Sequence, residues 1–172
     1  MKKEKSAVLL TRRLELRSFH EADRGSVIAI LRDDTVKKTY MLPDFPDDAA
    51  AGKLFERLMM LSNDKTRFLY AISLDGRAIG FLNDVEIGED GIEVGYVIAP
   101  QEQNRGYASE SLTAAIAELF RMGYRLVSAG FFEENPASGR VMEKSGMHRV
   151  ERTDEIEYRG ATHHCIYYEI EK

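Results

Sequence analysis

The sequence predicts an α+β fold with a mixed, mostly antiparallel sheet of six to seven strands and about four helices. Three observations predict it. The middle of the chain has three strand-like apolar runs separated by tight-turn residues, which is typical of an antiparallel meander. Amphipathic segments with helical spacing lie on both sides of this meander. A strand–helix–strand succession follows, and such a connection produces a locally parallel pair of strands.

The first third of the chain predicts one strand and two helices. Alternating apolar residues predict a strand over Val8–Phe19. A helix is expected over Glu21–Arg32, followed by a loop with two prolines over Asp34–Asp47. An aspartate at the end of that loop caps a second helix, which extends to about Ser62.

The meander occupies the middle of the chain. Arg67–Leu74 is a nearly continuous apolar run, and Asp75-Gly76 predicts a two-residue hairpin turn because both positions favour positive φ. Arg77–Ile87 is the return strand. A third strand over Ile92–Ile98 ends at Pro100.

The last part of the chain predicts a helix, a strand, a short helix and two final strands. In that order, their ranges are Ala108–Met122, Arg125–Phe132, Ala137–Lys144, Met147–Tyr158 and Thr162–Ile170. Gly146 is expected as the C-terminal cap of the short helix. The final two strands are expected to pair around a turn at Arg159-Gly160.

The composition agrees with one globular unit. The chain has 172 residues, of which 44% are hydrophobic and 31% are charged. These values exclude collagen, coiled coil and intrinsic disorder. A chain of this length buries roughly 70% of its unfolded surface, so it needs neither metal nor disulfide to fold. No repeat or Pro/Gly-rich linker interrupts the sequence, and we expect residues 1–172 to form a single domain.

Charge and apolar patterning limit the partners and the location. Lys and Arg number 24 against 29 Asp and Glu, a net charge of −5 without a basic block, which argues against a nucleic-acid partner. No run approaches the ~18 apolar residues that span a membrane. The charged start Met1–Lys5 does not resemble a signal peptide. The single cysteine, Cys165, is compatible with a reducing compartment. We therefore expect a cytoplasmic monomer or homodimer that binds no membrane.

The loop before the longest predicted helix carries the chemistry. It closes with Gly106 and Ala108, whose small side chains let an anion approach the backbone. Asn104 tolerates left-handed dihedrals, and Arg105 adds charge. The N–H groups of this loop and of the first helical turn predict a phosphate or pyrophosphate site, with an ordinary strand–loop–helix connection as the alternative. The Walker pattern and G-x-G-x-x-G are absent, which argues against a nucleotide triphosphatase and a Rossmann dehydrogenase.

The same loop resembles a known cofactor motif. Gln103-x-x-Gly106-x-Ala108 matches the acetyl-CoA motif Q/R-x-x-G-x-G/A of the GCN5-related N-acetyltransferase (GNAT) superfamily. It also lies where that family has the motif, between the fourth strand and the third helix. Asn104 replaces a common glycine of the family, which removes no donor that the site needs.

Two further segments extend the resemblance over nearly the whole chain. Asn135–Ser138 with the following Val141–Met147 is similar to the family's N-x-x-S…K-x-G-F segment, with Met147 in place of the usual Phe. Leu14–Arg17 resembles its opening L-x-L-R strand. The details most resemble the branch that acetylates N-terminal amines of ribosomal proteins on alanine or serine, a branch that also contains small-amine acetyltransferases.

The resemblance implies a GNAT-like sheet whose central strands splay apart after Pro100. Pantetheine then lies in the gap, bonded to the backbone of the Ile92–Ile98 strand. An N–H near Val97 or Ile98 stabilises the oxyanion that forms when an amine attacks the thioester directly. The implied co-substrate is acetyl-CoA, without a metal, and the implied acceptor is a small amine or a peptide N-terminus.

The resemblance also implies cofactor-binding residues. They are Val97, Ile98, Gln103, Asn104, Arg105, Gly106, Tyr107, Ala108, Ser109, Asn135 and Ser138. Ser138 is expected near the leaving thiolate, to which it donates a proton or a hydrogen bond; its alternative role is that of a helix N-terminal serine. Asn135 bonds pantetheine or backbone, or is a turn residue before Pro136.

Two glutamates are candidates for the general base. Glu157 precedes Tyr158 at the end of the penultimate strand, where the ribosomal-protein branch has a Glu-Tyr pair that supplies its proposed base. The alternative is a solvated glutamate in a charge-rich run. Glu93 lies on the cofactor strand, where partial burial raises a carboxyl pKa. A one-residue change of register, however, turns such a side chain to the other face.

The remaining candidates concern the acceptor and metals. The resemblance makes the proline-containing loop a wall of the substrate pocket, with Tyr40, Met41 and Phe45 as contacts; packing onto the core is the alternative. The adjacent His163 and His164 point to opposite faces of a strand and do not share a metal. Cys165 is expected in the core rather than as a nucleophile.

The sequence therefore predicts an acetyl-CoA-dependent N-acetyltransferase that acts on a primary amine. Two alternatives remain at this point. The first is a non-catalytic acyl-CoA-binding regulatory domain that has kept the fold. The second is an unrelated α+β scaffold protein whose Gly106 loop binds nothing.

Overall fold

The computed structural model describes all of residues 1–172 and contains one eight-stranded sheet in the order β1-β2-β3-β4-β5-β6-β8-β7. The strands are β1 (Leu9–Leu10), β2 (Glu15–Arg17), β3 (Leu69–Leu74), β4 (Arg77–Ile87), β5 (Gly91–Ile98), β6 (Leu126–Phe132), β7 (His148–Tyr158) and β8 (Ala161–Glu171). The helices are α1 (Arg24–Arg32), α2 (Asp34–Lys37), α3 (Asp48–Asn63), α4 (Tyr107–Met122) and α5 (Pro136–Lys144). Short 3₁₀ turns span Glu21–Asp23 and Pro100–Glu102.

The predicted α+β class and the mostly antiparallel sheet are confirmed, while the counts differ by one strand and one helix. The strand expected over Val8–Phe19 is two short strands, because the chain turns at Thr11, whose N–H donates to the Leu14 carbonyl at 2.9 Å. The loop expected over Asp34–Asp47 begins with the single-turn helix α2, whose first N–H groups are capped by the carboxylate of Asp33.

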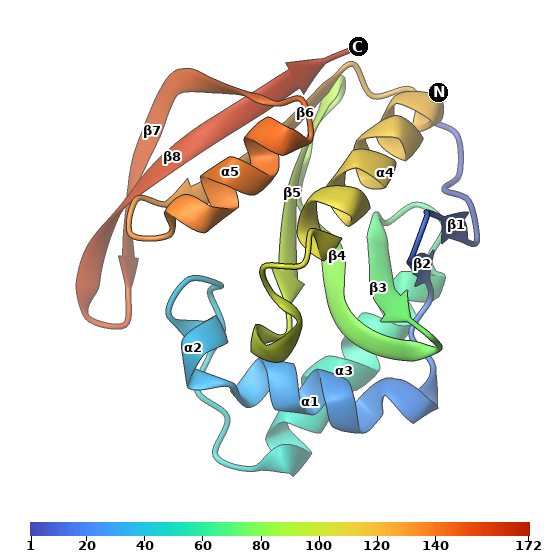
Figure 1. Ribbon diagram of the computed structural model, residues 1–172, viewed down its shortest axis with the longest axis vertical. Coiled ribbons are helices and arrows are strands. Elements are labelled where there is room, and N and C mark those ends of the chain that lie inside the picture. The colour runs from blue at the N-terminus through green and yellow to red at the C-terminus, as the bar shows by residue number, and fades with distance from the viewer.

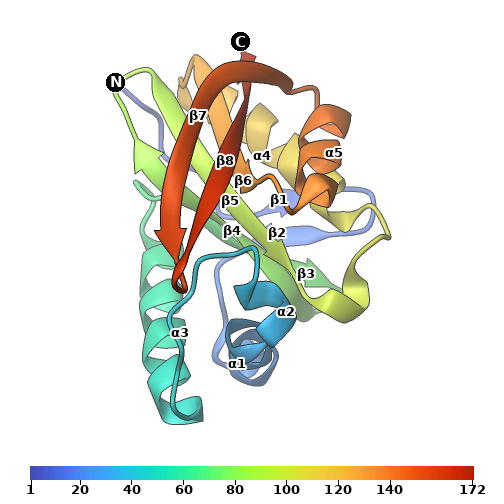
Figure 2. The same cartoon turned by 90° about the vertical axis from the view of Figure 1, so that its left-hand side faces the viewer.

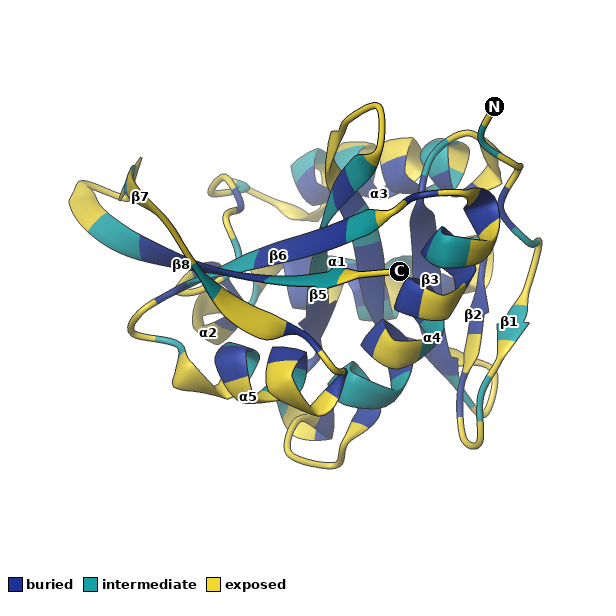
Figure 3. Cartoon of the chain, turned by 90° about the horizontal axis from the view of Figure 1, so that it is seen from above, coloured by how far each residue is buried: buried dark blue, intermediate teal, exposed yellow.

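The two faces of the sheet are covered by different helices (Figure 1), and the side view separates them clearly (Figure 2). Helices α4 and α5 cover one face, where 23 buried residues form the larger core cluster. Helices α1, α2 and α3 cover the other face, over a second cluster of 14 buried residues. Figure 3 shows that burial is concentrated in the central strands and that the outer strand β7 is mostly exposed.

Both predicted hairpin turns are present. Asp75 and Gly76 have φ values of 50° and 81°, and they join β3 to β4. Arg159 and Gly160 have φ values of 53° and 74°, and they join β7 to β8. Two successive positive φ values match the right-handed twist of the flanking strands, so both hairpins are tight.

The sheet divides within β5. Strands β5 and β6 form the one parallel pair, and it covers only three residues on each strand, ending at Glu93 opposite Ser128. Beyond Glu93, β5 pairs only with β4, and β6 pairs only with β8. The strands therefore diverge inside β5, and the divergence expected after Pro100 is corrected to this earlier point. A register irregularity between Asp84 and Glu86 of β4 lies beside Glu93, and such irregularities increase local twist and turn a strand away from its neighbour.

None of the helices combines the length and the apolar character that would let it cross a membrane.

Candidate active site

A cleft of about 830 Å³ opens where β5 and β6 diverge. One wall is β5, and the opposite wall is formed by the end of β6 and by α5. The loop before α4 closes one end, and α2 with the segment after it closes the other. The cleft thus passes through the sheet and is open to groups from both faces.

Side chains alternate along β5, and this alternation decides toward which face of the sheet each side chain points. Val94 and Ile98 belong to the core under α4 and α5, whereas Val97 belongs to the core under α1 and α3. Because side chains alternate along a strand, Tyr96 lies on the α4–α5 face and Glu93 lies on the α1–α3 face. Both residues line the cleft. One strand therefore presents a carboxylate from one side of the divergence and a phenol from the other.

The loop before α4 has the backbone geometry of an anion site. Asn104 and Gly106 have φ values of 60° and 82°, and Gly106 is the residue that precedes the first turn of α4. Successive N–H groups in such a conformation point toward one spot, together with the free N–H groups of the helix N-terminus. A Cβ placed on Gly106 would lie 3.2 Å from an Arg13 guanidinium nitrogen, so the position is restricted by space as well as by φ.

Two side chains hold this loop in place. The Gln103 amide donates to the Ile98 carbonyl at 3.0 Å, which ties the loop to the end of β5. Arg13 donates to the Arg105 carbonyl at 2.9 Å, which ties the loop to the segment before β2. Gln103, at the first position of the motif, therefore stabilises the conformation of the loop itself, independently of any contact with a ligand.

Of the eleven predicted cofactor-binding residues, all but Arg105 line the cleft. The Arg105 side chain is exposed and lies 3.4 Å from the Glu102 carboxylate instead. Only its backbone belongs to the loop.

The backbone of β5 distinguishes Ile98 from Val97 as an oxyanion donor. The Ala99 N–H donates to the Ile79 carbonyl of the neighbouring strand segment at 2.7 Å. In an antiparallel pair every second residue bonds the same neighbour, so Val97 also directs its N–H to β4. The N–H of Ile98 faces the side on which β5 has no partner strand. Of the two residues expected to donate, Ile98 is therefore the one whose N–H is free of β4.

Ser138 is joined to a tyrosine that the sequence analysis did not single out. The hydroxyl of Tyr96 lies 2.7 Å from Oγ of Ser138 and 3.0 Å from its carbonyl oxygen. Burial raises the pKa of Tyr96, so the phenol keeps its proton over the neutral range. The signal available in the sequence was alternation, since Tyr96 lies two residues from Val94 and from Ile98 on the cofactor strand. The Asn135 side chain lines the cleft and caps no backbone group of α5.

Glu93 lies at the divergence itself, with its side chain 14% exposed. Burial raises the pKa of Glu93, and the nearby carboxylates of Glu86 and Asp154 act in the same direction. The Arg152 guanidinium, 3.4 Å from Oε2 of Glu93, opposes this shift. A carboxylate with a raised pKa beside an open cleft suits proton transfer near neutral pH.

The structure does not bring Glu157 to the cleft. Glu157 is exposed, and its carboxylate accepts a hydrogen bond from the Thr162 hydroxyl. Its neighbours on β7 point inward: Ile156 lines the cleft, and Tyr158 packs against Phe132. Because side chains alternate along the strand, the carboxylate of Glu157 faces outward.

The segment after α2, which is expected to contact the acceptor, forms a wall of the cleft with two of its three predicted residues. Tyr40 and Met41 line the cleft, and the Tyr40 hydroxyl donates to Oδ1 of Asn83 at 2.6 Å. Asn83 also lines the cleft and was missed by the sequence analysis. Phe45 packs against the core under α1 and α3 and does not reach the cleft, so for this residue the packing alternative is correct.

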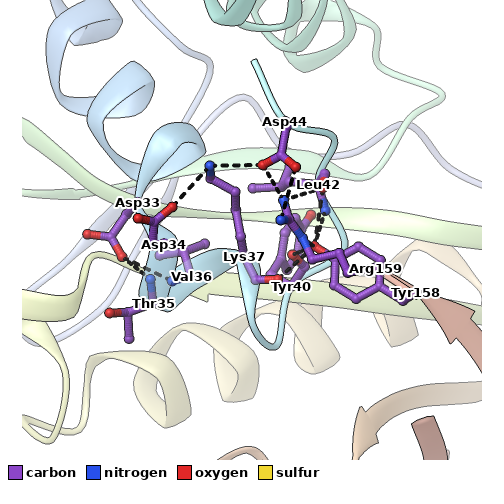
Figure 4. A network of polar contacts seen from close by, with 10 residues as sticks. All are labelled: Asp33, Asp34, Thr35, Val36, Lys37, Tyr40, Leu42, Asp44, Tyr158 and Arg159. Carbon is purple, nitrogen blue, oxygen red and sulfur yellow. Dashed lines mark hydrogen bonds and ion pairs between the residues drawn. The ribbon is translucent and has the colours of Figure 1, made fainter. Parts of the chain in front are cut away.

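The tip of the β7–β8 hairpin is bound to this wall (Figure 4). The Tyr158 hydroxyl donates to the Lys37 carbonyl at 2.7 Å and accepts from the Leu42 N–H at 3.1 Å. Arg159 donates to the same hydroxyl at 2.9 Å and pairs with Asp44 at 2.7 Å. The hairpin therefore fixes the segment that carries Tyr40 and Met41.

Comparison with known proteins agrees with this architecture. The family model described as "Acetyltransferase (GNAT) domain" matches residues 13–148. The uncharacterized N-acetyltransferase YnaD of Bacillus subtilis is 32% identical over 143 residues, which cover 82% of each chain.

Two solved structures extend the comparison. A GNAT-family acetyltransferase from Bacillus anthracis superposes with a TM-score of 0.82 at 26% identity, over 95% of this chain and 98% of the other. The ribosomal L7/L12 alpha-N-protein acetyltransferase RimL, solved with coenzyme A, has a TM-score of 0.81 at 19% identity, over 95% and 97% of the two chains. At that identity the likeness to RimL concerns the fold.

Proposed function

Since the chain belongs to the GNAT acetyltransferase family, we propose that it transfers the acetyl group of acetyl-CoA to a primary amine, which attacks the thioester directly. The observation that carries the proposal is the alternation on β5, which presents Glu93 from one face of the sheet and Tyr96 from the other. Acceptor and donor can then meet at the divergence from opposite faces.

The residues present fit a CoA thioester. The positive φ values of Asn104 and Gly106 create a concave run of N–H groups at the α4 N-terminus, which suits a diphosphate. The free edge of β5 beyond Glu93 offers backbone groups to the amides of pantetheine. When bound, acetyl-CoA supplies a thioester whose carbonyl carbon an amine can attack.

Glu93 is the proposed general base. Most primary amines are protonated at neutral pH, and attack requires the neutral form. Glu93 lies on the acceptor side of the sheet, and the raised pKa keeps its proton affinity closer to that of an ammonium ion. Glu93 therefore receives the proton of the acceptor, directly or through one water molecule.

Negative charge also develops on the carbonyl oxygen and on the sulfur. Ile98 stabilises the first, and the pair of Tyr96 and Ser138 stabilises the second. The Ile98 N–H donates to the carbonyl oxygen as negative charge develops on it. As the new C–N bond forms, the nitrogen releases its second proton to solvent, and the C–S bond breaks so that the sulfur leaves as a thiolate. Tyr96, hydrogen-bonded to Ser138, holds a proton for that sulfur on the α5 side. No covalent intermediate with the protein is required.

The acceptor is proposed to be a small amine or a peptide N-terminus. The wall formed by Tyr40, Met41 and Asn83 leaves the acceptor side of the cleft open to solvent at Met41, which is 53% exposed. The name of RimL refers to a protein N-terminus as acceptor, and its fold is shared by this chain.

The test of the proposal is thiol release from acetyl-CoA, measured with a panel of amines and of peptides that begin with serine or alanine. We expect release that depends on one class of acceptor. Isothermal titration with acetyl-CoA accompanies it. Absence of binding at millimolar ligand would contradict the proposal outright.

A glycine substitution locates the cofactor. Gly106→Glu places a carboxylate at the diphosphate position and is expected to weaken CoA binding by more than about tenfold, about 1.4 kcal/mol. Gly106→Ala is the matched control, since it carries the same φ strain and the contact with Arg13 without the charge. Equal CoA binding by Gly106→Glu and the wild type would show that the loop is not the diphosphate site.

A further inference from the structure

The cleft contains charged side chains that the proposed reaction does not use. Each carboxylate that lines it has an arginine partner. These pairs are Asp84 with Arg67, Glu93 with Arg152 and Glu102 with Arg77. The cationic side chains that line it are Lys38, Arg140 and Lys144, and none of them has a carboxylate oxygen within 4.0 Å. In a chain with net charge −5, unpaired cations inside a cleft indicate an anionic ligand.

Arg140 and Lys144 form one cationic patch on α5. They are four residues apart, so their side chains project from the same helical face, one turn from each other. Glu143 lies between them in sequence but accepts a hydrogen bond from the Tyr168 hydroxyl at 2.8 Å, toward β8. No carboxylate of α5 itself therefore neutralises the patch. Lys38 follows α2 on the acceptor side and does not belong to it.

The patch faces the neighbourhood of the proposed diphosphate loop. Helices α4 and α5 lie beside each other on one face of the sheet (Figure 1). The Ser145 hydroxyl contacts the Ser109 carbonyl at 3.4 Å, which joins the C-terminal end of α5 to the first turn of α4. Lys144 precedes this contact by one residue. The patch on the α5 wall and the loop that closes the cleft therefore lie near each other, at the same end of the cleft.

Different chemistry on the two walls suits different phosphates. The loop offers backbone N–H groups, which are uncharged donors, in a small concavity. Such a concavity suits a diphosphate. Arg140 and Lys144 are exposed, and they offer two full charges at the rim of the cleft. Such a pair suits a terminal phosphate monoester, since guanidinium binds phosphate oxygens in pairs and ammonium adds a point charge. CoA has one such group, the 3′-phosphate of its ribose.

We propose that Arg140 and Lys144 bind the 3′-phosphate of CoA and that the enzyme thereby distinguishes CoA from dephospho-CoA. This rests on the proposed use of acetyl-CoA, and it adds the residues that select the nucleotide end of the ligand.

The experiment is isothermal titration of the full-length protein with CoA and with dephospho-CoA. The wild type is expected to bind CoA at least about tenfold more tightly. The double variant Arg140→Gln/Lys144→Gln is expected to lose this preference by weakening the binding of CoA alone. The matched control is Lys53→Gln/Arg57→Gln, which removes two exposed cations four residues apart on α3, outside the cleft. This control is expected to keep both affinities.

The outcomes separate the two proposals. If the wild type binds both ligands equally, the inference fails and the proposed function stands. If the double variant weakens both ligands to the same degree, the patch contacts the diphosphate, and the assignment to the 3′-phosphate is overturned. If the wild type binds neither ligand, the proposed use of acetyl-CoA fails together with the inference.

Discussion

Glu93 and Glu157 show how the surroundings of a side chain decide its chemistry. Both are glutamates on strands, and both were candidates for the base. Glu93 is largely buried beside the divergence, and burial raises its pKa. Glu157 faces solvent and accepts a hydrogen bond from Thr162. A carboxylate that is poorly solvated and adjacent to the cleft is the better proton acceptor.

The two glutamates give a paired test of the general base. Glu93→Gln is expected to lower kcat by about 10²–10⁴-fold, the usual range for a lost acid or base, with little effect on CoA affinity. Glu157→Gln is expected to keep the wild-type rate. Rates should be measured by thiol release over pH 6–9. A large loss of rate in Glu157→Gln but not in Glu93→Gln would identify Glu157 as the general base instead of Glu93.

The raised pKa of Glu93 also predicts a pH-dependent stability difference. Because the folded-state pKa exceeds the unfolded value, the carboxyl group contributes stability below the unfolded pKa and loses it as the pH rises through the folded pKa. Glu93→Gln does not titrate, so its Tm relative to wild type is expected to be higher at pH 8 than at pH 4. Thermal denaturation at both pH values measures this. A Tm difference that does not change with pH would contradict the raised pKa.

Arg152 is the one cation that lowers the pKa of Glu93, whereas the carboxylates of Glu86 and Asp154 raise it. Arg152→Gln is expected to raise the pKa of Glu93 further. A base works only when deprotonated, so the acid limb of the rate–pH profile should move to higher pH, with the same plateau in alkaline solution. Arg149→Gln, on the same strand, is the control and should leave the limb in place. If the acid limb of the rate–pH profile does not move in Arg152→Gln, Arg152 does not influence the pKa of the general base.

At the scale of elements, the proposed acceptor wall is held by a hairpin far away in the sequence. The Tyr158 hydroxyl uses its one proton for the Lys37 carbonyl and its two lone pairs for the Leu42 N–H and the Arg159 guanidinium. Every hydrogen-bonding position of that oxygen is occupied. The segment after α2 lacks regular structure of its own, so its position depends on this contact (Figure 4).

Tyr158→Phe tests this contact because it removes only the hydroxyl. We expect the free energy of unfolding to fall by about 1–3 kcal/mol, since partly buried backbone groups lose their partner. We also expect a higher KM for the acceptor with an unchanged CoA affinity, because Tyr40 and Met41 lose their support. Urea denaturation and titration with CoA measure the two effects. The neighbouring variant Glu157→Gln should show neither, and a rise in the Kd for CoA in Tyr158→Phe would argue against a role confined to the acceptor wall.

At the scale of the whole molecule, the sheet consists of two parts joined by a short parallel contact. Strands β1–β5 form one part and β6–β8 the other, and three residue pairs connect them. The loop before α4 follows the first part, α5 follows β6 of the second part, and both line the cleft. A ligand in the cleft therefore contacts both parts and adds to the short β5–β6 junction between them.

Ligand binding is expected to protect this junction from hydrogen exchange. At 100 times its Kd, a ligand adds about 2.7 kcal/mol to the stability of the folded state. We expect CoA to slow exchange mainly in Gly91–Ile98 and in the first turn of α4, and less in the β3–β4 hairpin. Exchange followed by mass spectrometry, with and without CoA, measures this. Equal slowing in all strands would indicate global stabilisation without a role for the junction.

Much of the fold and part of the site could be predicted from the sequence. The β4 strand, the turn at Asp75-Gly76 and the long helix after Gly106 follow from local patterns: apolar spacing, preferred φ values and caps. The loop at Gln103 was recognisable for the same reason, because its proposed role depends on backbone conformation within a few residues. Local rules apply wherever the relevant contacts are short in sequence.

Other features required contacts between distant segments. The sequence showed two candidate glutamates, but only the packed sheet decided that Glu93 faces the cleft, because strand orientation changes with a single-residue shift of register. It placed Phe45 in a suggestive loop, and packing moved that ring into the core.

By itself, then, the sequence determined the kinds of element, their order and the backbone conformation of the loop before α4, all of which depend on neighbouring residues. Tertiary structure decided where β5 and β6 part, that Tyr96 meets Ser138, and that α5 turns Arg140 and Lys144 toward the cleft. These outcomes depend on how remote segments pack against one another, and no local pattern encodes them.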